Sequence, residues 1–252
     1  MNHLRAATKG VLQQVEERTG RSVQFLRDDS LKVMATFQMA RDGASYHVLR
    51  YRPTDDPIDY LVVHQAAFVL RLYENPADQR FDFAPRDSAA ELMATLIAAG
   101  RPLAPSDAKA LPNFANFTAH WTMLNLRSFP VGMRVDAWID ETLPELRDLQ
   151  RASLAAQQQE SVASLSFRQG GLSLPKMTIA LVAAYALFVD RMFGSTGYAV
   201  PYRAGGVSDM GSALLQAWDD IDAAATHDTE LIDRWAALCG LSGQYDWIPF
   251  RP

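Results

Sequence analysis

Residues 57–74 constrain the fold most, because this segment is apolar on nearly every face. Asp56 followed by Pro57 is typical of a helix start, since aspartate caps a helix N-terminus and proline suits the first turn. Asn75 and Pro76 end the pattern. A helix that is apolar all round lies in a protein interior. The sequence therefore predicts a central buried helix with these apolar positions: Ile58, Leu61, Val62, Ala66, Val69 and Leu72.

The chain before this helix has the pattern of one further helix and three strands. Residues 3–18 form an amphipathic pattern that stops at Gly20. Strands are expected at residues 23–26, 31–39 and 46–51, and a turn at residues 41–43 separates the last two. The second strand alternates strictly, with these residues on its apolar face: Leu31, Val33, Ala35, Phe37 and Met39. The predicted order is helix, three strands, helix.

The central helix also carries the pentapeptide His64-Gln65-Ala66-Ala67-Phe68. His64 and Phe68 are four residues apart, so they share one face of the helix. This pentapeptide, on a helix that follows a helix and a small sheet, resembles the minimal core of the zincins, the metallopeptidases with His-Glu-x-x-His at this place. The resemblance covers roughly residues 3–75.

The resemblance implies a metal site that this chain has lost. By position, His64 matches the first zinc ligand, Gln65 the general base and Phe68 the second ligand. A glutamine amide cannot accept a proton near neutral pH, and a phenyl ring cannot bind a metal. The expectation is therefore a catalytically inactive zincin-like protein without a cofactor, in which His64, Gln65 and Phe68 are candidate binding residues.

Two other interpretations of His64 remain open. It is an ordinary core histidine, hydrogen-bonded to a neighbour, or it belongs to a metal-dependent hydrolase with a rearranged site. The second interpretation needs further ligands, and the candidates are His47, His120, Asp136, Asp140, Glu141 and Glu145. Acidic residues on a long helix are usually solvated, and each of the two histidines is better explained as a core or surface residue.

Past residue 80 the pattern predicts helices without strands, at residues 87–99, 114–127, 137–161 with a break near Pro144, 175–193, 210–224 and 228–238. The proline-rich residues 100–113 are expected to form a connection. The predicted class is α+β. Residues 1–252 are expected to form a single compact domain, with an α+β half at residues 1–100 and an all-helical half at residues 101–252, and a split near residue 105 is the alternative.

Two segments near the C-terminus have ordinary structural explanations. An acidic run that includes Asp219, Asp220, Asp222, Asp228 and Glu230, with His227, lacks the glycine bend of a calcium loop, so capping and solvation account for it. The apolar residues 247–250 are expected to pack back onto the protein rather than to contact a partner.

Composition excludes several classes of function. A net charge of −5 and a pI near 5.5 give no basic footprint for nucleic acid. Cys239 is the only cysteine, so the chain has no internal disulfide and fits a reducing compartment. The longest apolar run, residues 179–189, is too short to cross a bilayer. We expect a cytoplasmic binding or regulatory module whose partner is another protein.

Overall fold

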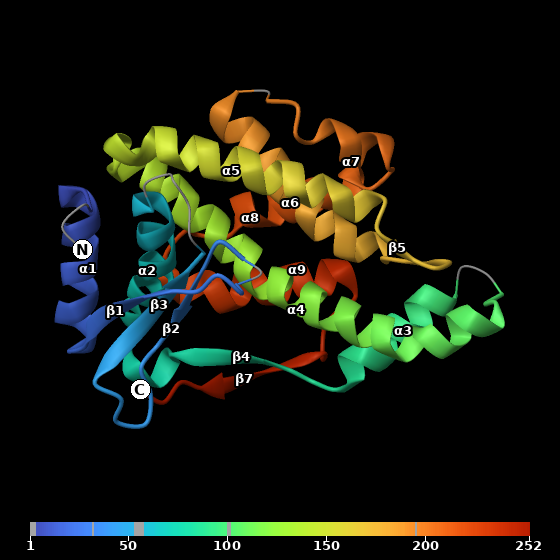
Figure 1. The fold of residues 1–252 in the computed structure, drawn as a ribbon, viewed down its shortest axis with the longest axis horizontal. Helices are drawn as coiled ribbons and strands as arrows, with labels where there is room; N and C mark the ends of the chain where they lie inside the picture. Colours follow the sequence, from blue (N-terminus) through green and yellow to red (C-terminus); the bar gives the residue numbers. More distant parts are fainter. Residues whose placement is uncertain (1–3, 32, 53–57, 100–101, 195) are drawn as a thin grey trace. The chain divides into compact units, whose positions relative to one another are not determined.

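The computed structural model of the chain describes residues 4–31, 33–52, 58–99, 102–194 and 196–252 (Figure 1). The chain divides into two compact units. Unit 1 comprises Met1–Asp82, Arg134–Ser153 and Pro249–Pro252, and unit 2 comprises Phe83–Met133 and Leu154–Ile248. The units alternate along the sequence, so no single cut of the chain separates them. The expectation of one compact domain over residues 1–252 stays a prediction.

Unit 1 combines a small sheet with helices (Figure 1). Its first two helices are α1 (Ala6–Thr19) and α2 (Asp59–Glu74), and α1 packs against α2. The sheet has the order β1-β3-β2, in which β1 (Ser22–Arg27) is parallel and β2 (Ala35–Gln38) antiparallel to the central β3 (Tyr46–Tyr51). Helix α1 contacts β1, and α2 contacts β2.

The two faces of this sheet differ in burial. On β3, His47 and Leu49 are fully buried, whereas the side chain of Tyr46 is 42% exposed. The exposed face continues onto β1, where Gln24 is exposed and Leu26 is 44% exposed. Because successive side chains point to opposite faces of a strand, one face of the sheet contributes to the core and the other faces solvent.

A buried carboxylate joins the starts of the first two helices. Asp59, in the first turn of α2, accepts hydrogen bonds from the backbone N–H of Arg5 at 2.7 Å and from the hydroxyl of Thr8 at 2.5 Å. Arg5 is the N-cap residue of α1 and has no capping side-chain oxygen of its own. Asp59 therefore satisfies a free N–H group at the N-terminus of α1, where a negative charge also favours the helix dipole.

Unit 2 is mainly helical. Its helices are α3 (Ser88–Ala98), most of α4 (Pro105–Thr142), the later part of α5 (Arg147–Val162), α6 (Lys176–Phe193), α7 (Val200–Ala204), α8 (Ser208–Asp220) and α9 (Asp228–Cys239). Strand β4 (Phe81–Pro85) pairs with β7 (Tyr245–Pro249), and β5 (Arg168–Gln169) pairs with β6 (Leu172–Ser173). Short 3-10 helices lie at Ala163–Leu165 and Ala225–His227 in unit 2, and at Ala77–Gln79 and Pro144–Leu146 in unit 1.

Helix α6 forms the centre of unit 2, and α8 crosses it at very close range. A Cβ atom added at Gly211 of α8 would lie 3.0 Å from the Cβ of Ala183 and 3.1 Å from the backbone N of Ala184. Both alanines belong to α6 and are fully buried. Small residues at one point on each helix therefore permit the close contact between α6 and α8.

The structure confirms the α+β class and the helical C-terminal half. It also contains the short strands β4, β5, β6 and β7, which the sequence did not indicate. The expected connection at residues 100–113 is wrong from Pro105 onward, because α4 continues through Pro112 and Pro130 to Thr142. The break near Pro144 is confirmed. The helix start assigned to Asp56 and Pro57 lies outside the described residues.

We predict that Gly211→Ala destabilises the protein by about 1–3 kcal/mol, because the added methyl group must push α6 and α8 apart. Gly10→Ala is the matched control. Gly10 lies inside α1 with no atom within 4 Å of an added Cβ, so this change is expected to stabilise by about 0.5–1 kcal/mol. Urea unfolding measures both variants, and equal effects would contradict a tight crossing at Gly211.

Candidate functional site

The structure places His64 among aromatic rings. Its imidazole lies between Tyr60, one turn earlier on α2, and Phe68, one turn later, with ring centroids 5.6 Å and 5.4 Å away. The side chain is 18% exposed. The spacing of four residues on a helix produces this stack, because side chains at i and i+4 lie on the same face.

Asp136 approaches His64 from α4. Its carboxylate is fully buried and accepts hydrogen bonds from the hydroxyl of Tyr60 at 2.7 Å and from the side-chain amide of Gln150 at 3.1 Å. The same amide donates to the backbone carbonyl of Asp136 at 2.9 Å. The Asp136 carboxylate therefore connects α2, α4 and α5 within unit 1.

The imidazole of His64 is close to this carboxylate without a hydrogen bond to it. Its Nε2 lies 3.8 Å from Oδ2 of Asp136, beyond hydrogen-bond distance, and this buried nitrogen has no hydrogen-bond partner. Burial lowers the pKa of His64 below its ordinary value, and the charge of Asp136 opposes this effect. His64 is therefore a neutral imidazole at pH 7.

The predicted site residues do not fit a catalytic zinc ion. Such a site uses three protein ligands and an open position, whereas Phe68 has no donor atom and Gln65 offers an amide in place of a base. Within the described ranges, no group of three or more His, Cys, Asp or Glu side chains is arranged to hold a metal ion. His64 and Asp136 alone leave the ligand set one short.

The other candidate ligands are placed individually. Asp140 pairs with Arg147 at 2.7 Å, and Glu141 and Glu145 are exposed on the surface. These three carboxylates therefore match the solvated interpretation, and Asp136 is the carboxylate that approaches His64. His120 is exposed.

His47 is a core histidine of the sheet. Its Nδ1 accepts a hydrogen bond from the backbone N–H of Ala40 at 2.9 Å, and its Nε2 lies 2.9 Å from the hydroxyl of Thr19. Since Nδ1 accepts, the proton of the neutral ring is on Nε2, which donates to Thr19. Burial, followed by the charge of Arg21, lowers the pKa of His47. Both ring nitrogens of His47 thus form hydrogen bonds within unit 1.

Strand β1 presents backbone groups at the outer edge of its sheet. The N–H of Asp28 donates to the carbonyl of Tyr51 at 3.0 Å, so the even-numbered residues of β1 direct their N–H and C=O groups toward β3. Backbone groups alternate in direction along a strand. The odd-numbered residues Val23, Phe25 and Arg27 therefore direct theirs away from β3, where the described residues place no further strand.

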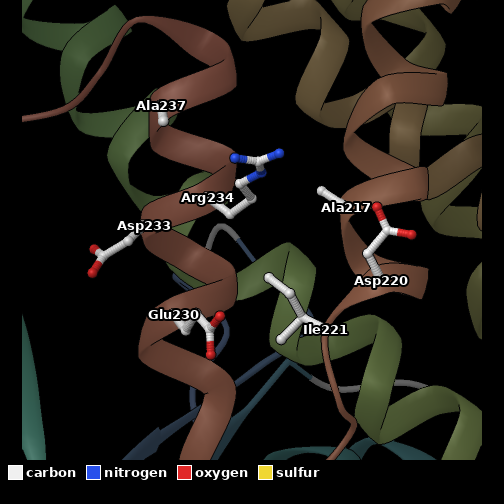
Figure 2. A pocket seen from close by; sticks show the side chains of 7 residues that line it. All are labelled: Ala217, Asp220, Ile221, Glu230, Asp233, Arg234 and Ala237. Atoms are coloured by element: carbon white, nitrogen blue, oxygen red, sulfur yellow. The ribbon is translucent and has the colours of Figure 1, made fainter.

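Unit 2 contains a groove between α8 and α9 (Figure 2). Its volume is about 470 Å³, and it is lined by Ala217, Asp220, Ile221, Glu230, Asp233, Arg234 and Ala237. Figure 2 shows the guanidinium of Arg234 directed from α9 toward α8, whereas the carboxylate of Asp233 points away from the groove. The acidic residues 219–230 were expected to serve only capping and solvation, and no sequence signal indicated the groove.

Of the four apolar C-terminal residues, Phe250 and Trp247 pack onto the protein, whereas Ile248 and Pro249 are exposed. In unit 1, the ring of Phe250 is buried and meets the ring of Tyr73 edge-on at 6.0 Å, with the guanidinium of Arg41 4.8 Å from its centroid. In unit 2, the indole N–H of Trp247 donates to Asp233 at 2.9 Å. Ile248 remains 49% exposed.

No family model, curated protein or solved structure matches this chain. The resemblance to zincins therefore stays a prediction from the residues of the chain. Among the described helices, none combines the length and the apolar character needed to span a membrane.

We predict that stability falls as the pH decreases below about 6.5, the ordinary pKa of histidine. The unfolded chain takes up protons at His47 and His64 in that range, while the lowered pKa values keep the folded protein from doing so. This stability is fully present above pH 6.5. Urea unfolding from pH 7 to pH 5 should show a smaller loss for His64→Gln than for the exposed control His120→Gln. Equal pH profiles would contradict the burial of a neutral His64.

Proposed function

We propose that this chain is a non-catalytic, zincin-like binding module that takes an extended segment of another protein at the outer edge of β1. The observation that carries the proposal is the outward direction of the backbone groups of Val23, Phe25 and Arg27. An added strand forms hydrogen bonds with such groups, and its side chains are selected by the neighbouring surface.

The composition of β1 supports strand addition. Proteins usually protect exposed edges with proline, bulges or inward-pointing charges, and β1 runs as Ser-Val-Gln-Phe-Leu-Arg with an unbroken register to β3. Leu26 is 44% exposed beside this edge. An apolar side chain of the added strand has a contact surface there.

The surroundings of His64 favour binding over catalysis. The residue in the general-base position is Gln65, and Asp136 is already hydrogen-bonded to Tyr60 and Gln150. Gln65 therefore supplies no general base, and the hydrogen bonds to Oδ1 hold Asp136 as a structural contact between helices. A protein partner and a cytoplasmic location belong to this proposal, which assigns no role to nucleic acid or a cofactor.

Selection from a library of random peptides tests the strand-edge proposal. We expect peptides that bind the wild-type protein and Val23→Ala equally but bind Val23→Pro much more weakly. Proline removes an outward N–H group that β3 does not use, so the fold is retained, and alanine controls for the lost side chain. Circular dichroism checks the fold of both variants. If selected peptides bind Val23→Pro as well as they bind Val23→Ala, the edge is not the binding site.

The alternative is a metal-dependent hydrolase with a rearranged site around His64, and the distance of 3.8 Å between His64 and Asp136 favours it. Metal analysis of untagged protein separates the two functions. For the binding module we expect far less than one zinc per chain, with no difference between the wild type and His64→Ala. About one zinc per chain that is lost in His64→Ala would support the hydrolase instead.

A further inference from the structure

The groove between α8 and α9 is built by two facing helix stripes. Ala217, Asp220 and Ile221 follow the i, i+3, i+4 spacing on α8 and just beyond its end, and Glu230, Arg234 and Ala237 follow the i, i+4, i+7 spacing on α9. Alanine on both stripes leaves space that larger side chains would fill. The stripe on α9 is about 10 Å long, which equals roughly two turns of a bound helix.

The lining of the groove separates into an apolar floor and a charged rim. Ala217, Ile221 and Ala237 supply apolar surface, while Asp220, Glu230 and Arg234 supply charge (Figure 2). Asp220 accepts a hydrogen bond from the amide of Gln216, and Glu230 lies 2.9 Å from the ring of His227. Both carboxylates are exposed at the groove.

The charge around the groove is strongly biased. Residues 219–234 contain one arginine, Arg234, and six carboxylates: Asp219, Asp220, Asp222, Asp228, Glu230 and Asp233. Asp219 pairs with Arg191 at 2.8 Å, and Asp233 accepts hydrogen bonds from Tyr245 and Trp247. Arg234 is the cation of the lining. Among the lining side chains, three carboxylates stand against one guanidinium, and this excess of negative charge favours a positively charged partner.

We propose that this groove binds an amphipathic basic helix of a partner protein. One or two apolar side chains of the helix enter the hollow between Ala217 and Ala237, and its lysine or arginine side chains meet Asp220 and Glu230. This is the groove-binding mode of amphipathic helices, in which apolar anchors recur one turn apart. The site lies in unit 2 and does not rest on the β1 edge.

Binding of two matched synthetic peptides to the full chain tests the proposal. Both peptides have the same amphipathic pattern of leucine, one with lysine and the other with glutamate at the polar positions. We expect the lysine peptide to bind with an affinity that falls with salt and the glutamate peptide not to bind. Failure of the lysine peptide to bind, or equal binding of both peptides, would overturn the proposal.

Two variants distinguish binding in the groove from nonspecific attraction by the net charge of the protein. Ala237→Phe fills the hollow at an exposed position, and Asp220→Lys with Glu230→Lys reverses its rim. We expect each to weaken binding by about tenfold or more, which corresponds to about 1.4 kcal/mol. The control Glu17→Lys with Glu160→Lys changes the net charge equally at exposed positions outside the lining and should leave affinity unchanged. An equal loss of affinity in this control would show that net charge, and not the groove, determines binding.

The variant Arg234→Ala tests whether the groove instead binds an acidic helix. If the groove held an acidic group, the guanidinium of Arg234 would be the anchor, and its removal would abolish binding of the glutamate peptide. For a basic helix, we expect Arg234→Ala to keep or increase the affinity for the lysine peptide, because a like charge is removed from the lining. Weaker binding of the lysine peptide to this variant would contradict the proposed contacts.

Discussion

The buried carboxylate of Asp136 is the contact on which the interior of unit 1 depends. A charge without exposure to solvent is tolerated where hydrogen bonds replace water, and Tyr60 and Gln150 supply these bonds from α2 and α5. The three helices must therefore keep one relative position, since a shift of any of them would leave a buried charge or donor unsatisfied. The rings around His64 are packed within this fixed arrangement.

The same contact limits the chemistry available to His64. Tyr60 and Gln150 hold Asp136 by Oδ1, and its Oδ2 stays 3.8 Å from Nε2 of His64, beyond hydrogen-bond distance. The imidazole is enclosed by Tyr60 and Phe68, and burial keeps it neutral. Packing against the rings of Tyr60 and Phe68 thus accounts for the position of the His64 side chain.

Periodicity was sufficient to predict the elements that bury a continuous apolar pattern. Apolar periodicity predicts the ends of α2, α6 and β3 within one or two residues, because each of these elements has a strong apolar pattern. It failed at β4 and β7, which pair over more than 150 positions of sequence, and at α4, where packing overrides two prolines. For the site, the shared face of His64 and Phe68 followed from spacing, and Asp136 was among four candidate carboxylates. Only the three-dimensional structure shows that Asp136, and not one of the other three carboxylates, approaches His64.

As proposed binding sites, the β1 edge and the α8–α9 groove would recognise different properties of a partner. An edge strand recognises backbone groups, so it tolerates many sequences, whereas a groove with an acidic rim selects side chains by size and charge. The two surfaces share no residue and belong to different units. For a partner that carried both an extended segment and a basic helix, the second contact would be intramolecular wherever the linker between its two segments spans the two sites. Specificity would then come from the groove, and the edge would add affinity with little dependence on sequence.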